Sequence, residues 1–175
     1  MTNRSRLVLL IGLLFTVGLI VGSSVLAQAP KPEDTALRSV REFYAYHLAH
    51  NKDFTVRNIQ LRKRFLTPEL YGLLVKELKR QAAESKAHPD EAPDYEGDPL
   101  TDSQEYPDSF RVGKAEMAGD VAKVTVTLQW SARTSRGVDK RDITVEATKG
   151  ATGWLINDII NSQGSRLQDD LKTKK

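Results

Sequence analysis

The hydrophobic pattern of the chain changes period once, and this change constrains the fold more than any other feature. Before residue 88 the apolar side chains recur every three to four residues, as on one face of a helix. After residue 109 they alternate with polar ones, as in a strand with one buried face. Helices followed by strands are typical of an α+β domain. We therefore predict two to three N-terminal helices packed on a four-stranded antiparallel sheet, with a short C-terminal helix.

Two helices are predicted before residue 67. The first covers 31–51, with Asp34 as its N-cap. Its apolar stripe follows a 3.6-residue period and consists of Leu37, Val40, Tyr44, His47 and Leu48. The second is a short helix within 52–66, where the pattern is less periodic. We expect three consecutive cations of this segment to lie in solvent: Arg62, Lys63 and Arg64.

The sequence TPEL at 67–70 predicts the start of a longer helix. Thr67 is a residue type preferred at the N-cap, and Pro68 fits the first helical position because its missing N–H would have no partner there. We expect this helix to run to about Lys86, since Pro89 stops its continuation.

Four strand-like runs follow, at 110–117, 121–130, 141–149 and 154–160. The short turns between them predict an antiparallel meander with one buried and one wet face. Trp130 and Trp154 lie on these strands, and we assign both to the core. A final short helix follows, with Ser165 as its cap and Leu167 and Leu171 facing inward.

The first 27 residues have the order of a secretory signal peptide. Two arginines precede residue 7, an uncharged run of fifteen residues spans 7–21, and small residues lead to a cleavage site after Ala27. The alternative is a retained anchor, because the uncharged stretch 7–27 is about as long as the roughly 20 residues that span a bilayer. The protein is therefore predicted to be exported, either as a periplasmic or secreted protein or anchored to the inner membrane by residues 7–27.

After this segment we expect a short linker at 28–33, a single domain over 34–172 and a frayed tail at 173–175. About 150 residues suffice for one hydrophobic core. The chain has no cysteine, which excludes disulfides and thiolate metal ligands. Its formal net charge is only +3, and this balance gives no support to nucleic-acid binding.

A long acidic loop is predicted at 87–109. Between Lys86 and Arg111 the chain holds eight acids and no lysine or arginine. The carboxylates follow an EF-hand-like spacing from Asp94 onward, but Pro99 stands where that loop requires glycine, which excludes a standard EF-hand. No cofactor is expected, although a looser calcium site stays open with these candidate ligands: Asp94, Asp98, Asp102 and Glu105.

Two other interpretations of the acidic loop stay open. In the first it is a structural lid, fixed to the body by Leu100, Tyr106 and Phe110. The side chains of Asp98, Asp102 and Gln104 then bond backbone groups. In the second it is a docking surface, since long ordered loops often have a function. The candidate binding residues are Asp98, Asp102, Gln104 and Tyr106.

The segments GDPLTDSQEYPDSFRVG at 97–113 and GWLINDI at 153–159 resemble a family of exported bacterial proteins of unknown function. The resemblance covers roughly residues 34–171. It implies a domain similar to the nuclear-transport-factor-2-like cone, in which a strongly curved antiparallel sheet wraps against helices and leaves a pocket at the open end. The family supplies no catalytic residues, and its relatives include enzymes and binding modules, so the resemblance does not decide function.

Asp158 is the main catalytic candidate. It shares strand parity with Trp154 and Ile156, which directs its side chain toward the core or the pocket. In ketosteroid-isomerase-like relatives of the cone, a carboxylate in an apolar pocket acts as a general base, here with Tyr44 or Tyr46, together with His47, as the hydrogen-bond donors. The alternative is a buried carboxylate bonded to an arginine or a backbone amide, with His47 a hydrogen-bonded core histidine.

We predict a non-enzymatic, exported accessory module of the cell envelope that binds a protein partner or a small ligand. Two alternatives stay open: an isomerase- or hydrolase-like enzyme that uses Asp158, and a calcium-structured envelope protein. The sequence contains no nucleophile elbow, phosphate-binding glycine loop or zinc signature.

Overall fold

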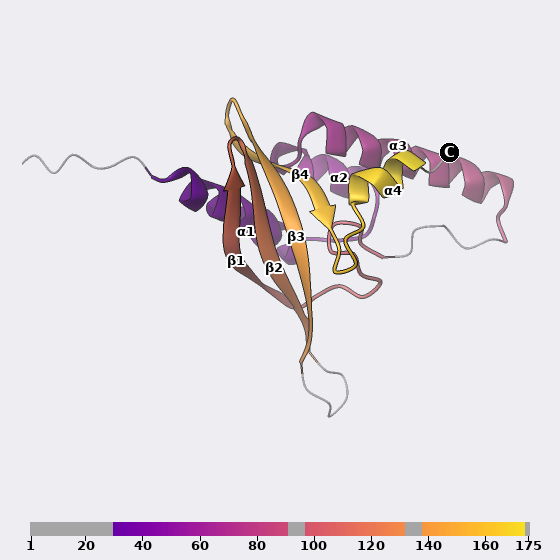
Figure 1. Ribbon diagram of the computed structural model, residues 1–175. Coiled ribbons are helices and arrows are strands. Elements are labelled where there is room, and N and C mark those ends of the chain that lie inside the picture. The colour runs from indigo at the N-terminus through magenta and orange to yellow at the C-terminus, as the bar shows by residue number, and fades with distance from the viewer. Residues whose placement is uncertain (1–29, 91–96, 132–137, 174–175) are drawn as a thin grey trace, which may run out of the picture.

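The structure is a computed structural model, and it describes residues 30–90, 97–131 and 138–173. Helix α1 lies across one face of a four-stranded sheet, and α3 and α4 lie beside strand β4 (Figure 1). This arrangement confirms the predicted α+β fold. The elements are α1 (Pro32–Ala49), α2 (Val56–Arg62), the 3₁₀ helix η1 (Lys63–Phe65), α3 (Pro68–Ala87), β1 (Ser109–Ala118), β2 (Val121–Trp130), β3 (Asp139–Gly150), β4 (Gly153–Ile160) and α4 (Leu167–Thr173).

The sheet is the predicted antiparallel meander. Its strand order is β1-β2-β3-β4, and every neighbouring pair is antiparallel. Each strand begins and ends within two residues of its predicted range. Two bulges interrupt the register, one in β1 between Val112 and Ala115, and one in β4 opposite Glu146 and Ala147. A bulge bends its strand and re-aims the side chains beyond it.

The hydrophobic core lies between α1 and the inner face of the sheet. Alternate residues of β2 are buried, namely Ala122, Val124, Val126 and Leu128. On β3 the corresponding residues are Ile143, Val145 and Ala147. The buried side of α1 differs from the predicted stripe, because Phe43 is fully buried whereas Leu37 and Leu48 are only half-buried.

The starts of the two long helices use different signals. Helix α1 begins at Pro32, and Lys31 occupies the N-cap position without a side-chain hydrogen bond, so the prediction of Asp34 as N-cap is wrong. Proline at the first helical position is preorganised for the helix and needs no partner for an N–H group. Thr67 caps α3 as predicted, because its hydroxyl accepts a hydrogen bond from the backbone N–H of Leu70 at 3.3 Å.

The predicted signal or anchor segment at 1–27 lies outside the described residues, and so does the part of the acidic loop at 91–96. Within the ranges that the structure describes, no helix combines the length and the apolar character needed to cross a membrane. The chain is described to Thr173, where α4 ends.

Candidate functional site

The second part of the acidic loop, residues 97–108, is closed by a tight turn around Asp98. The Asp98 carboxylate accepts a hydrogen bond from the backbone N–H of Leu100 at 3.0 Å, and the Asp98 N–H donates to the carbonyl of Ser103 at 2.8 Å. Gly97 has a φ of +103°, and a Cβ at this position would lie 2.2 Å from the Ser103 carbonyl oxygen, so only glycine fits. Leu100 is fully buried. These contacts confirm the predicted structural role of Asp98 and Leu100.

Asp98 also joins a buried chain of side chains with His47 of α1 and Arg62 of α2. His47 Nε2 lies 2.6 Å from Asp98 Oδ2, and Arg62 Nε donates to His47 Nδ1 at 2.5 Å. Because an arginine always carries its protons, Nδ1 must act as an acceptor. His47 therefore holds its own proton on Nε2 and donates it to Asp98. We call this chain the Asp98–His47–Arg62 network.

All three members of this network are buried, with exposures of 2% for Asp98 and 1% each for His47 and Arg62. Buried charges are tolerated when they are paired and hydrogen-bonded. The Arg62 guanidinium completes its bonds with the carbonyls of Asn58 and Asn51, both at 2.8 Å. The prediction that Arg62 lies in solvent is therefore wrong, because the side chain is buried and each of its three nitrogens donates a hydrogen bond inside the protein.

Tyr44 adds a second tie between α1 and the acidic loop. Its hydroxyl donates to the carbonyl of Leu100 at 2.9 Å. Burial, and then the neighbouring Asp98 carboxylate, raises the pKa of Tyr44 well above its usual value, so the phenol stays protonated and acts as a donor. Tyr44 and His47, two of the predicted donors for a catalytic Asp158, are thus both engaged with the acidic loop.

Asp158 is buried at the N-terminus of α4. Its carboxylate accepts hydrogen bonds from the backbone N–H groups of Ile159 at 2.9 Å and Gln168 at 3.0 Å, and it lies 2.8 Å from the Arg166 guanidinium. Burial raises the pKa of Asp158 above its ordinary value, although the two amides and Arg166 oppose this shift. These are the contacts of the structural alternative for Asp158, in which the carboxylate anchors α4 to β4.

The β4 bulge explains why strand parity misplaced Asp158. Ala147 pairs with Ile156 and Glu146 pairs with Asp158, so Asn157 is an extra residue on β4. Ile156 and Ile159 consequently both lie on the core face, whereas Asp158 lies on the same face as Glu146. The prediction that Asp158 shares a face with Ile156 is therefore wrong, because a bulge reverses the alternation beyond it.

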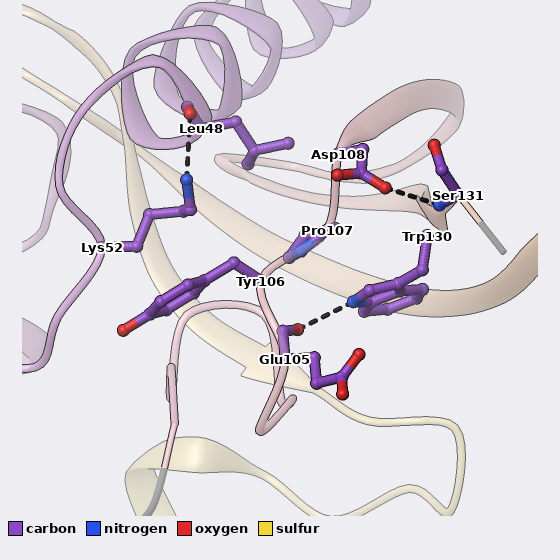
Figure 2. Close-up of a pocket in the computed structure, with 8 residues that line it drawn as sticks. All are labelled: Leu48, Lys52, Glu105, Tyr106, Pro107, Asp108, Trp130 and Ser131. Carbon is purple, nitrogen blue, oxygen red and sulfur yellow. Dashed lines mark hydrogen bonds between the residues drawn. The ribbon is translucent and has the colours of Figure 1, made fainter. Parts of the chain in front are cut away.

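Two adjoining grooves meet at Trp130, where the end of β2 faces the acidic loop, and we call this surface the Trp130 face (Figure 2). The first groove has a volume of about 490 Å³, and its lining includes Leu48, Lys52, Glu105, Tyr106 and Trp130. The second has a volume of about 520 Å³, and its lining includes Asp102, Gln104, Glu105, Trp130, Lys140 and Arg141. Both grooves combine aromatic surface with charges of both signs.

Hydrogen bonds and ring contacts hold the Trp130 face in place. The Trp130 indole N–H donates to the carbonyl of Glu105 at 2.7 Å, as Figure 2 shows. The Arg141 guanidinium carbon lies over the indole, 5.6 Å from the ring centroid, and Arg141 also donates to the carbonyl of Asp102. A half-buried indole is thus fixed between the acidic loop and β3, with part of its ring open to solvent.

Tyr106 is held by residues that follow α1. Lys52 Nζ lies 5.2 Å from the centroid of the Tyr106 ring, and the Tyr106 hydroxyl donates to Asp53 at 2.9 Å. Burial, and then the hydrogen bond to Asp53, raises the pKa of Tyr106 to about 12. The phenol is therefore a protonated donor at neutral pH, and it ties the loop to the turn between α1 and α2.

The four predicted binding residues divide into two groups. Asp102, Gln104 and Tyr106 line the Trp130 face, whereas Asp98 lies buried beneath it. Burial raises the pKa of Asp102, and Arg141 opposes that shift. The loop segment thus contributes both the surface and the buried turn that supports it.

Sequence reasoning missed the residues that other segments bring to this surface. Trp154 is buried as predicted, whereas Trp130 packs against the core but is only half-buried, so its assignment to the core is confirmed only in part. Lys52 and Arg141 were not singled out, because alternation along a strand or helix does not show which distant segment lies next to it. The one signal in the sequence for the partial exposure of Trp130 was its position at the last residue of β2.

The predicted calcium ligands lie apart in the described part of the chain. The Asp98 carboxylate is bonded to His47 and to the Leu100 N–H, and Asp102 faces Arg141 at 3.8 Å. Within residues 30–90, 97–131 and 138–173, no group of three or more acidic or histidine side chains is arranged to hold a metal ion. Asp94, the first predicted ligand, lies outside the described residues.

No protein-family model matches the chain, and no curated protein matches its sequence. Among solved structures, a chain of the type VI effector–immunity complex Tae3–Tai3 from Ralstonia pickettii shares 20% identity at a TM-score of 0.43, covering 71% of this chain and 93% of that one. A protein of unknown function from Bacteroides thetaiotaomicron shares 20% identity at a TM-score of 0.41, covering 73% and 89%.

A third solved structure, a phospholipid-binding protein from Ralstonia solanacearum in complex with a phospholipid, shares 16% identity at a TM-score of 0.39; the match covers 79% of this chain and 84% of that one. All three are distant structural similarities. Membership of the exported cone-fold family stays a prediction, and the α+β assignment rests on the helices and strands of this chain.

Proposed function

We propose that the protein is a non-enzymatic binding module that docks a protein partner through the Trp130 face. The observation that supports this proposal is the fixed, half-buried indole of Trp130 between two adjoining grooves, with Arg141 over its ring and Tyr106 in the lining of the first groove. Tryptophan, tyrosine and arginine are the residue types that contribute most to binding energy in protein interfaces.

The rigidity of this surface favours binding. The acidic loop reaches the surface from a turn that the buried Asp98–His47–Arg62 network holds against α1 and α2. A surface that is already ordered loses little conformational entropy when a partner docks, so more of the contact energy appears as affinity. The buried network thus supports the binding surface from beneath.

A binding role also agrees with the state of the acidic and basic side chains in the interior. Asp158 bonds two backbone amides and Arg166, and His47 bonds Asp98 and Arg62. In the described ranges no buried side-chain nitrogen or oxygen is without a hydrogen-bond partner. Polar groups that are fully used by the fold favour a structural role for these residues over a general base aimed at substrate.

The proposed place of action is the bacterial cell envelope, on the basis of the N-terminal segment at 1–27. Mass measurement of the exported protein tests this part: a mature chain that begins at Gln28 supports a cleaved signal peptide, and an intact chain in the membrane fraction supports the anchor.

Site-specific photo-cross-linking in cells tests the binding surface. A photoreactive residue at Gln104, which lines the Trp130 face, is compared with one at Lys123, which is exposed on β2. We expect one discrete adduct from position 104 and none from position 123. The Arg141→Ala change should abolish the adduct, whereas Lys114→Ala, an exposed change on β1, should preserve it. Equal adducts from both positions, or an adduct that survives Arg141→Ala, would contradict the proposal.

A further inference from the structure

A third groove lies on a different side of α1, between that helix, η1 and the start of β4. Its volume is about 600 Å³, and the lining residues relevant here are Glu42, Tyr46, Arg64, Phe65, Trp154 and Leu155. None of them lines either groove of the Trp130 face. We call this surface the Arg64 groove, and it is independent of the function proposed above.

Among the described residues, the Arg64 guanidinium makes its contacts in this groove with aromatic rings. Its guanidinium carbon lies 5.0 Å from the centroid of the Tyr46 ring and 4.6 Å from that of Phe65. Cation–π contacts of this kind position a guanidinium without using its N–H donors. In the part of the chain that the structure describes, Arg64 forms no hydrogen bond or ion pair, whereas Arg62 bonds His47 and backbone carbonyls.

The walls of the groove are anchored to the core. The Phe65 ring packs edge-to-face on the buried Phe43 ring, with centroids 5.8 Å apart. Trp154 is 7% exposed, and its indole N–H donates to the hydroxyl of Thr35 at 3.0 Å. A fixed aromatic platform with an arginine on it is preorganised for a ligand, because little side-chain entropy is lost on binding.

The charges of the groove select the ligand. A guanidinium presents a planar fork of donors that matches one carboxylate in a bidentate manner. The same fork also matches phosphate, but a phosphate dianion carries a second negative charge. Here the adjacent Lys63 lies over the Tyr71 ring, with its Nζ 5.2 Å from that centroid, and Glu42 adds a negative charge to the lining, so the charge balance favours a carboxylate. A single carboxylate next to apolar side chains is the complement of Arg64 beside aromatic walls.

We propose that the Arg64 groove binds an acidic residue of an extended peptide segment of a partner protein, with a neighbouring apolar side chain against the aromatic walls. The carboxylate accepts the donors of Arg64, and the apolar neighbour contacts Tyr46, Phe65 or Trp154. Glu42 disfavours a segment with several consecutive acids, because like charges at one site repel each other.

Peptide titrations followed by NMR on the isotope-labelled full chain test this assignment. The probes are acetyl-Leu-Glu-Leu-amide and its neutral isostere acetyl-Leu-Gln-Leu-amide. We expect the acidic peptide to shift the amide signals of Tyr46, Arg64 and Trp154, and the neutral peptide to bind about tenfold more weakly, since a charge-assisted bidentate contact is lost. This comparison uses the unaltered protein and does not depend on the folding of any variant.

Variants of exposed residues complete the test. Arg64→Gln should weaken binding of the acidic peptide by about tenfold. The affinity of Arg64→Lys for the acidic peptide should lie between those of the parent and of Arg64→Gln, because lysine keeps the charge but lacks the planar fork of N–H donors. Arg57→Gln, an exposed arginine of α2, should leave the affinity unchanged.

Three results would overturn the assignment: equal affinity for the two peptides, undiminished binding to the Arg64→Gln variant, or displacement of the acidic peptide by an equal concentration of inorganic phosphate. The last result would indicate a general anion site. Since the Arg64 groove shares no lining residue with the Trp130 face, Arg141→Ala should not affect peptide binding, and the two proposals fail or succeed separately.

Discussion

Asp98 and Asp158 are both buried carboxylates, but the arginine that balances each of them lies in a different environment. Arg62, which reaches Asp98 through His47, is 1% exposed, whereas the Arg166 side chain beside Asp158 is 35% exposed. Asp98 holds a loop against two helices, and Asp158 accepts a hydrogen bond from the Gln168 amide in the first turn of α4. The first network is therefore enclosed by protein, and the second is open to solvent on one side.

The difference matters when one member of a network is lost. A charge that stays behind in an enclosed site has no water to solvate it, so it destabilises the fold strongly. A charge at the edge of the protein turns toward solvent and loses little. We therefore expect the Asp98–His47–Arg62 network to be much more sensitive to substitution than the contacts of Asp158.

The largest effect is expected from Arg62→Leu. This change leaves the Asp98 carboxylate buried without its cation and should lower the free energy of unfolding by about 3–5 kcal/mol. Urea denaturation of the full chain measures the loss, with Arg57→Leu on the exposed side of α2 as the matched control, expected within about 0.5 kcal/mol of the parent. A loss for Arg62→Leu no larger than the control would show that the network contributes nothing to stability.

The second prediction concerns Asp158→Asn, for which we expect a loss of at most about 1 kcal/mol at neutral pH. Because burial raises the pKa of Asp158 in the folded state, the native protein binds this proton more tightly than the unfolded chain does. The contribution of Asp158 to stability is therefore fully present below the unfolded pKa of about 3.9 and decreases as pH rises through the raised folded pKa.

Unfolding free energies of the parent and of Asp158→Asn, measured from pH 3.5 to pH 7, test this sign. As pH rises, the free energy of unfolding of the parent should fall relative to that of Asp158→Asn. A difference that moves in the parent's favour would mean that Arg166 and the amides of Ile159 and Gln168 outweigh burial, and that the two networks are more alike than the structure indicates.

A smaller, local effect is expected for Tyr106. Burial and the hydrogen bond to Asp53 raise the pKa of Tyr106 to about 12, from an unfolded value of about 10. The protonated phenol therefore stabilises the fold fully below about pH 10, and this contribution is lost as pH rises through about 12. Ultraviolet absorbance should show one tyrosine ionising near pH 12 that is absent in Tyr106→Phe. Asp53→Asn should lower the midpoint. A difference between the parent and Tyr106→Phe that titrates near pH 10 would contradict the hydrogen bond to Asp53.

The smallest effect is expected from calcium. Because Asp98 is bonded to His47 and Asp102 faces Arg141, thermal unfolding of the full chain in excess EDTA and in millimolar calcium should give coinciding curves. A ligand at 100 times its dissociation constant adds about 2.7 kcal/mol of stability. If calcium adds this much and the effect disappears in Asp102→Asn, the acidic loop contains a calcium site.

The elements of the fold were predictable because their signals are local. The strand ranges, the antiparallel order and the Thr67 cap follow from alternation, from short turns and from a threonine before a proline. Burial of Leu100 was also predictable, since a leucine in an acidic loop has few other roles. Each of these features depends on residues that are close together in the sequence.

The candidate site was less predictable because its residues come from separate segments. In the sequence, Arg62 is one of three consecutive cations. Only its position beneath the acidic loop shows that it is buried. The one-residue bulge at Asn157 reversed the direction of Asp158. Trp130 was placed in the core by alternation, although the loop beside it leaves part of its ring open.

The sequence by itself determined the fold class, the strand ranges and the acidic character of the loop, because hydrophobic periodicity and turn residues act over a few positions. Only the tertiary structure decided which charges are buried together and which aromatic rings stay open to a partner. Pairing of His47 with Arg62 and of Trp130 with Glu105 depends on how distant segments pack, and that packing is specified by the whole core and not by any single stretch of the chain.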